Sequence, residues 1–214
     1  MHKIEKVKGG KTYAFFKRFF DIFFSLLAII VLSPLLLIIG LLVVTTSKGP
    51  MIYSSDRIGQ YGRKFRFFKF RSMKENAEKE LDELLSKNEV EGGVTFKIKD
   101  DPRITKFGKF LRKTSLDELP QLFNILIGDM SIIGPRPCTV REYELYSDYD
   151  KQRLLVPQGL SGEWQVNGRS STTFDEMVEM DLDYIENKRS LLYDAKLIFE
   201  TIVLMFAPNK NGAE

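Results

Sequence analysis

The sequence predicts a mainly helical α+β protein with a membrane-inserted helical segment, further amphipathic helices and a small β-hairpin. Three observations predict this class: an uncharged apolar run from Ile22 to Val44, strand-like alternation at Lys64-Phe65-Arg66-Phe67, and helical periodicity through the second half. The chain has 214 residues, 43% of them hydrophobic and 29% charged, which suits one soluble core plus an anchor. We expect a basic N-terminus and membrane segment over residues 1–47, and a soluble domain over 48–214.

The apolar run is long enough to cross a bilayer. As one helix it would extend about 34 Å at ~1.5 Å per residue, against a hydrocarbon core of ~30 Å. Ser33-Pro34 lies in the middle of the run, where proline kinks or breaks a helix. Lysine and arginine flank both ends, which favours placing both on one side. These residues leave two topologies open: a helix-break-helix hairpin dipping into one leaflet, and a kinked spanning helix.

At the entry to the run stands the group Lys17-Arg18-x-x-Asp21. A bare carboxylate in lipid is costly, so we expect Asp21 to pair with a base or with a backbone donor.

The soluble part is expected to begin with a hairpin, whose strands Met51 to Ser54 and Lys64 to Phe67 are joined through Gly59-Gln60-Tyr61-Gly62. Helices are expected over residues 74–88, 106–112, 120–127, 140–155, 173–187 and 194–205, with a glycine-rich stretch at 159–168. The last helix has an apolar stripe that fits either the core or a membrane surface.

Composition excludes several kinds of site. The single cysteine, Cys138, excludes an internal disulfide and a cysteine-rich metal site, and the single histidine, His2, argues against histidine-dependent triads and zinc sites. The sequence contains neither a phosphate-loop lysine motif nor a dinucleotide-binding glycine fingerprint. We expect no nucleic-acid partner, and any catalysis must rest on carboxylates, bases and backbone groups.

The strongest local signal is the run Ser115-Leu116-Asp117-Glu118-Leu119-Pro120-Gln121. Ser115 and Glu118 have the spacing of a capping box, whereas Pro120 at the first helical position would leave both acids just before the helix. In either register the carboxylates face the positive end of a helix, with Arg112 nearby in sequence. We therefore expect Asp117 to be ionised and nucleophilic. A carboxylate beside a metal-binding carboxylate suits attack on a phosphoryl group.

A second signal is a set of bases next to glycine, proline or the end of the hairpin: Lys69, Arg71, Arg136 and Arg169. Arginine forks match phosphate oxygens, so together with the acid pair these bases suggest a diphosphate site. Two acid-x-acid triplets, Asp148-Tyr149-Asp150 and Asp181-Leu182-Asp183, match a pattern of metal-dependent glycosyl transferases, but such triplets arise by chance in charged helices.

With these motifs in order, the chain resembles the monotopic phosphoglycosyl transferases, a bacterial sugar transferase family, over roughly residues 14 to 206. The motifs that carry the resemblance are Lys17-Arg18-x-x-Asp21, Ser33-Pro34, Lys69-Phe70-Arg71-Ser72-Met73, Asp101-Pro102-Arg103-Ile104-Thr105, Ser115 through Gln121, Gly128-Asp129-Met130-Ser131, Gly134 through Pro137, and Gln165-Val166-Asn167-Gly168-Arg169.

The resemblance implies a re-entrant protein of the bacterial inner membrane, broken at Ser33-Pro34, with residues 48–214 as a cytoplasmic catalytic domain. It implies transfer of sugar-1-phosphate from a UDP-sugar to undecaprenyl phosphate, with release of UMP and an aspartyl-phosphosugar intermediate. Asp117 would be the nucleophile and Glu118 a ligand of Mg²⁺, while Arg112 and Arg136 would contact phosphate.

The resemblance also suggests a short form or an excised catalytic core, since about a dozen residues precede the match. Glu163 stands where relatives often carry an apolar or aromatic residue. Neither the sugar nor the oligomeric state, which includes a possible homo-oligomer, follows from these motifs. Two rivals remain: a metal-dependent glycosyl transferase that uses an acid-x-acid triplet, and a non-enzymatic scaffold bound to membrane lipids.

Overall fold

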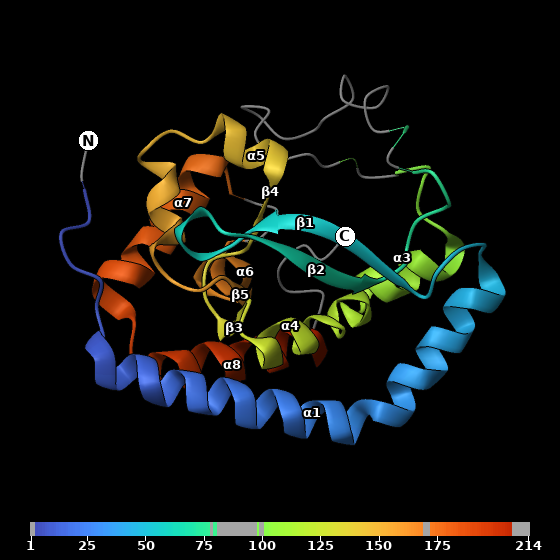
Figure 1. The fold of residues 1–214 in the computed structure, drawn as a ribbon, viewed down its shortest axis with the longest axis horizontal. Helices are drawn as coiled ribbons and strands as arrows, with labels where there is room; N and C mark the ends of the chain where they lie inside the picture. The colour runs from blue at the N-terminus through green and yellow to red at the C-terminus, as the bar shows by residue number, and fades with distance from the viewer. Residues whose placement is uncertain (1–2, 78, 81–97, 99–100, 169–171, 207–214) are drawn as a thin grey trace.

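The computed structural model describes residues 3–77, 79–80, 98, 101–168 and 172–206. Its first element is the long helix α1 (Gly10–Thr46), which contains Pro34 and is the one helix in this part of the chain long and apolar enough to cross a membrane. The helix is assigned as one segment from Gly10 to Thr46, although Pro34 lacks an amide donor, and it bends in its second half (Figure 1). Beside the bend, the Ser33 hydroxyl donates to the Ile30 carbonyl at 2.8 Å, as serine near a proline kink often does.

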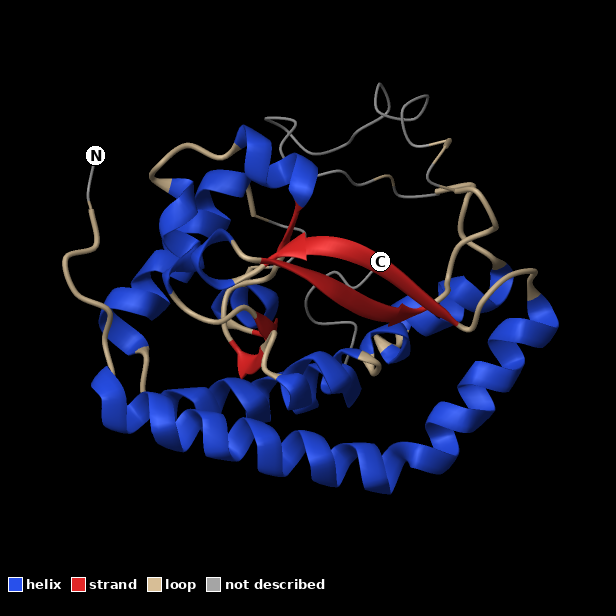
Figure 2. Cartoon of the chain, viewed as in Figure 1, coloured by secondary structure: helices blue, strands red, loops and turns tan. Residues whose placement is uncertain are grey.

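The predicted hairpin is confirmed and is longer than expected. Strand β1 (Ile52–Ile58) pairs antiparallel with β2 (Lys64–Phe70) through the short helical turn η1 (Gln60–Gly62). On its other edge β1 pairs with β4 (Cys138–Thr139), so β1 is the central strand of three. A separate parallel pair, β3 (Ser131–Ile133) with β5 (Gly159–Ser161), was not predicted (Figure 2).

Apart from a short turn at residues 116–118, four helical segments follow the hairpin as far as residue 155 in the part of the chain described. They are α3 (Lys106–Lys113), α4 (Gln121–Ile127), α5 (Val140–Leu145) and η4 (Asp150–Leu155). The end of α4 at Gly128, with φ of 100°, confirms the predicted stop. The helix expected over 140–155 is interrupted instead. The Ser147 amide and hydroxyl both donate to Asp150 there, which offers the backbone an alternative to the helix.

The C-terminal part contains α6 (Glu163–Asn167), α7 (Phe174–Asp183) with the π-turn η6 (Tyr184–Lys188), and α8 (Leu191–Phe206). The last two predicted helices are thus confirmed in position. In residues 159–168, for which the sequence predicted only a glycine-rich stretch, the structure has β5 and α6. Most of the helix expected at 74–88 lies outside the described residues. The main core packs α7 and α8 against β3, with Ile133, Val178, Ile185 and Leu197 fully buried.

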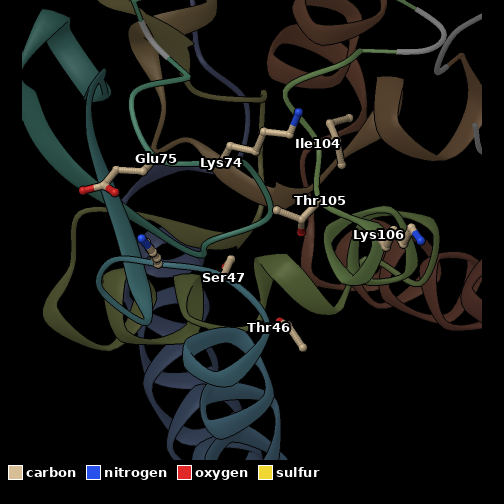
Figure 3. Close-up of a pocket in the computed structure, with 8 residues that line it drawn as sticks. Thr46, Ser47, Lys74, Glu75, Ile104, Thr105 and Lys106 are labelled. Carbon is tan, nitrogen blue, oxygen red and sulfur yellow. The ribbon is translucent and has the colours of Figure 1, made fainter.

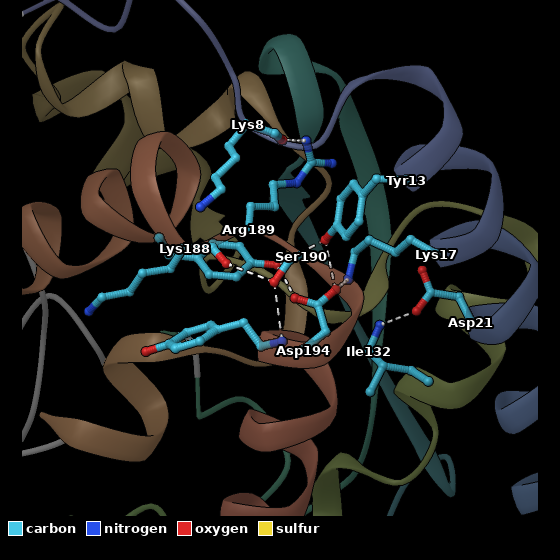
Figure 4. Close-up of polar contacts among 11 residues, drawn as sticks. Lys8, Tyr13, Lys17, Asp21, Ile132, Lys188, Arg189, Ser190 and Asp194 are labelled. Atoms are coloured by element: carbon cyan, nitrogen blue, oxygen red, sulfur yellow. Dashed lines mark hydrogen bonds and ion pairs between the residues drawn. The ribbon is translucent and has the colours of Figure 1, made fainter.

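Polar contacts attach the first half of α1 to the soluble body, where α8 and α4 lie alongside it (Figures 1 and 4). Lys17 and the Tyr13 hydroxyl both donate to Asp194 of α8, at 2.8 and 2.7 Å. Arg18 donates to the Ile125 and Leu126 carbonyls of α4. Asp21 accepts from the Ile132 amide at 3.0 Å, which confirms the backbone partner expected for this carboxylate.

Candidate active site

The acid pair lies in a tight turn between two helices. Asp117 and Glu118 end the turn η3 (Leu116–Glu118), and Pro120 is the N-cap residue of α4. Ser115 adopts the left-handed conformation, with φ of 56°, and its side chain caps nothing. The capping-box alternative is therefore wrong. A left-handed non-glycine residue is strained, and such strain tends to occur at functional sites.

Lys69 joins the two carboxylates. It comes from β2, and its ammonium lies 2.6 Å from Glu118 Oε1 and 3.7 Å from Asp117 Oδ2. Asp117 is buried, with 4% of its surface exposed, whereas the Glu118 side chain keeps 31%. Glu118 is therefore the carboxylate that solvent and ligands reach more easily, and Asp117 lies deeper.

The two carboxyl groups are electrostatically different. Burial raises the pKa of Asp117, and the adjacent charge of Glu118 adds to the rise, although Lys69 opposes both. Burial also disfavours the charge on Glu118, but Lys69 and Arg136 outweigh it and hold the pKa of Glu118 below its usual value. Glu118 therefore ionises readily, whereas Asp117 is more basic. Burial thus opposes the ionisation of Asp117 that the sequence predicted from the helix end alone.

Arg112 and Arg136 approach this pair from different elements. Arg112 ends α3 and donates from Nε to the Ser72 hydroxyl at 2.9 Å, within electrostatic reach of Asp117. The close approach of α3 to Ser72 depends on Gly108, where an added Cβ would lie 1.9 Å from the Ser72 carbonyl oxygen. Arg136 is exposed between two buried prolines, and its charge acts on Glu118.

Not every predicted residue joins this cluster. Arg71 is 7% exposed and donates to the Val43, Ser47 and Pro50 carbonyls, so it holds the C-terminal end of α1 instead of facing the acid pair. Arg169 lies outside the described residues.

The acid-x-acid triplets form no second site. Asp148 is fully exposed, with Lys151 at 3.8 Å, whereas Asp181 is buried against Arg153 at 2.6 Å. Asp183 pairs with Lys188 at 2.7 Å. Within the described ranges, no group of three or more histidine, cysteine or acidic side chains could hold a metal ion.

Comparison with known proteins now decides the family, because a model described as bacterial sugar transferase matches residues 12–208. The chain belongs to the bacterial sugar transferase family. It is 46% identical over 190 residues to the galactosyl transferase CpsE of Streptococcus agalactiae, covering 87% of this chain and 41% of that protein. The undecaprenyl-phosphate galactose phosphotransferase of Salmonella typhimurium is 43% identical, covering 93% of this chain and 42% of that protein.

A relative with greater coverage is the exopolysaccharide production protein ExoY of Sinorhizobium fredii, 44% identical over 87% of this chain and 83% of that protein. The chain thus spans about two fifths of the first two relatives and most of the third. The resemblance drawn from the sequence motifs is confirmed at the level of the family.

An open pocket lies at the end of α1, and none of the residues that line it belongs to the acid pair. It is lined by Thr46, Ser47, Lys48, Lys74, Glu75, Ile104, Thr105 and Lys106 (Figure 3). Ser72 links the pocket to the pair, because its carbonyl accepts from the Thr105 amide at 3.0 Å and its hydroxyl accepts from Arg112.

One base near the pair was missed from the sequence. Arg57, on β1, acts electrostatically on Glu118 and packs over the Phe67 ring at 5.2 Å, and the Lys69 ammonium lies 5.5 Å from the same ring. The predicted strand ended at Ser54, three residues too early to place Arg57 opposite β2. A longer strand would have put Arg57 and Lys69 on one face of the hairpin, since directly paired residues share a face.

Proposed function

We propose that this chain transfers sugar-1-phosphate from a UDP-sugar to undecaprenyl phosphate, releasing UMP, as a membrane step of polysaccharide assembly. The observation that carries the proposal is a buried carboxylate, Asp117, held beside an ionised Glu118 and surrounded by Lys69, Arg112 and Arg136. The names of relatives support the proposal, since they include a UDP-glucose:undecaprenyl-phosphate glucose-1-phosphate transferase of Klebsiella pneumoniae, 42% identical over 87% of this chain.

The proposed reaction has two displacements. An Asp117 oxygen attacks the phosphorus next to the sugar, the bond from that phosphorus to the UMP oxygen breaks, and its electron pair leaves with UMP. The phosphate of the lipid then attacks the aspartyl phosphorus, which frees Asp117 and forms the lipid diphosphate-sugar. Because burial makes Asp117 more basic, the ionised carboxylate is a stronger nucleophile than a solvated one.

The residues present fit a magnesium ion shared with substrate. Mg²⁺ is usually held by one or two carboxylates together with substrate phosphates and water, and Glu118 supplies one such carboxylate beside the nucleophile. When bound, the ion would neutralise the phosphate oxygens that repel a carboxylate. Lys69 holds Glu118 in place and keeps it ionised for this role.

Exposed apolar surface supports a membrane location. Side chains along α1 are largely exposed, with Phe15, Ile30 and Leu37 between 63 and 72%. On α8, Leu192 is 86% and Phe199 66% exposed. Because α8 lies alongside α1, these side chains suit one continuous contact with lipid, where the lipid substrate also resides.

The contacts of α1 favour the re-entrant topology. A straight helix of 37 residues would extend about 55 Å at ~1.5 Å per residue, so its ends would emerge on opposite sides of a bilayer. Here one soluble body binds both ends, through Lys17 with Asp194 at the first and Ser47 with Arg71 at the second. A body on one side of the membrane can reach both ends more readily if α1 bends, and α1 does bend beyond its middle (Figure 1).

The proposal is tested by incubating the protein with a UDP-sugar and Mg²⁺ in the absence of lipid. The panel of donors should include UDP-glucose, UDP-galactose and acetamido sugars. We expect UMP release and a mass increase of one sugar phosphate on the protein, and discharge of this adduct when undecaprenyl phosphate is added. Asp117→Asn should abolish the adduct, whereas Asp148→Asn, at a fully exposed acid of a triplet, should retain it.

Other outcomes separate the rivals. Release of UDP would support a metal-dependent glycosyl transferase, and binding of membranes without turnover of any donor would support a scaffold. UMP release only when both substrates are present, with no adduct on rapid quench, would show direct transfer, with Asp117 at most a general base.

A further inference from the structure

Arg57 lies at the centre of the sheet that carries the site. Its strand β1 is paired on both edges, with Arg57 opposite Phe65 of β2 and opposite Thr139 of β4. The backbone position is therefore fixed, and packing on the Phe67 ring limits the side chain. Its guanidinium lies within electrostatic reach of Glu118 and Arg136.

The guanidinium of Arg57 is poorly satisfied. Nη1 donates to the Pro137 carbonyl at a long 3.4 Å and lies 3.9 Å from Glu142, whose carboxylate already accepts from the Thr139 amide at 2.6 Å. Among the residues that the structure describes, buried Nε of Arg57 has no hydrogen-bond partner.

Two buried arginines among the described residues have close carboxylate partners, although Arg153 Nη2, like Arg57 Nε, makes no hydrogen bond. Arg103 makes a bidentate contact with Asp101, at 2.6 and 2.9 Å, and Arg153 donates to Asp181 at 2.7 Å and to the Tyr146 hydroxyl at 2.7 Å. A cation whose side chain is only 16% exposed and incompletely paired is costly, and Arg57 lies here within electrostatic reach of a second cation, Arg136. Burial and the charge of Arg136 both lower the pKa of Arg57, while Glu142 opposes them.

The charges around Glu118 indicate a site that is short of negative charge. Lys69, Arg57 and Arg136 act on this carboxylate, and Arg112 acts on Asp117. With Glu142 at 3.9 Å from Arg57 included, these four cations face three carboxylates, which leaves an excess of one positive charge when all three acids are ionised. An anion with several oxygens, such as a diphosphate, would compensate it.

We propose that Arg57 is a ligand of the donor diphosphate and that it neutralises the phosphate that departs with UMP. The inference rests on the proposed function and adds a binding residue to it. The bond that breaks joins the sugar-bearing phosphorus to the bridging oxygen of the diphosphate. Its electron pair stays on that oxygen, which leaves with UMP, and a fixed guanidinium stabilises the negative charge that develops there.

The test measures UMP binding to the intact protein in lipid nanodiscs by calorimetry, which requires no turnover. Arg57→Gln should weaken UMP binding about tenfold to 100-fold, the loss expected for charge-assisted hydrogen bonds. Arg57→Lys should fall between wild type and Arg57→Gln, since it keeps the charge but loses the fork. Arg63→Gln, at an exposed arginine of the same hairpin, is the matched control and should bind UMP as the wild type does.

A second measurement uses the wild type alone, so it does not depend on how the variants fold. Modification of Arg57 by an arginine-directed dicarbonyl reagent, followed by mass spectrometry, should slow when UMP is present. Unchanged UMP affinity in Arg57→Gln, or modification of Arg57 at the same rate with and without UMP, would overturn the inference. Failure of the wild type to bind UMP and to form the adduct would instead overturn the proposed function.

Discussion

Glu118 is the residue whose proposed role can be separated most directly from a structural one. Its carboxylate contacts Lys69 at 2.6 Å, and it belongs to no capping box. Glu118→Gln keeps the shape of the side chain but removes the charge that would hold Mg²⁺ near the diphosphate. We expect donor-only adduct formation to slow at least about 100-fold, with little rescue by added Mg²⁺.

Glu144→Gln is the control for this prediction, because Glu144 is an exposed acid on α5. It should form the adduct at the rate of the wild type. A Glu118→Gln protein with near-normal rates at ordinary Mg²⁺ would remove Glu118 from the metal site.

Individual side chains show how far the sequence could predict the site. Asp117 and Glu118 stood out because both carboxylates face the positive end of a helix in either register, with Arg112 nearby in sequence, although a capping box was an alternative explanation. Arg57 was missed because its place depends on strand register, and register is set by pairing between distant segments. Arg71 was grouped with the phosphate ligands since the sequence gives no sign that the end of α1 would require its guanidinium.

At the scale of elements, the bent α1 allows a direct test of topology. Lys6→Cys and Lys64→Cys place thiols at exposed positions before α1 and on the hairpin. In sealed vesicles, both should react with a membrane-impermeant reagent from the same side. Pro34→Ala restores a backbone donor and should straighten α1 in some molecules, so a fraction of the Lys6→Cys thiols should become accessible from the opposite side.

The native thiol should not interfere with this labelling. Burial raises the pKa of Cys138 to about 11, and only 2% of the residue is exposed, so at pH 8 almost no reactive thiolate is present. Wild-type protein should therefore label only after unfolding. Opposite accessibility of the two introduced thiols in the parent protein would exclude the re-entrant model.

Elements were predictable where their signals are local. The stop of α4 at Gly128 and the existence of the hairpin follow from short-range rules. Pairing of β3 with β5 joins segments almost thirty residues apart, and the break between α5 and η4 depends on side-chain contacts of Asp150, which outweigh helical periodicity.

At the scale of the whole molecule, the first and last long helices are joined through one buried carboxylate. Asp194 accepts from Lys17, Tyr13 and Tyr184, at 2.7 to 2.8 Å (Figure 4). The sequence predicted a mainly helical protein with an apolar N-terminal segment, and it predicted a polar partner for Asp21. It did not predict that α8 would hold α1, because Lys17 and Asp194 are separated by almost the whole chain.

Asp194→Asn should therefore weaken the molecule as a whole. The substitution leaves the Lys17 ammonium, whose side chain is 7% exposed, without its counter-charge, and removal of one partner of a buried pair costs about 3–5 kcal/mol. The free energy of unfolding, measured by circular dichroism with denaturant in detergent micelles, should fall by that amount.

Lys196→Gln is the control, because it breaks an exposed pair with Glu200 in the same helix. It should change the free energy of unfolding by less than about 0.5 kcal/mol. Adding Lys17→Met to Asp194→Asn should restore part of the loss, because no buried charge then remains unpaired. An Asp194→Asn protein as stable as the Lys196→Gln control would show that the contact between α1 and α8 contributes nothing to folding.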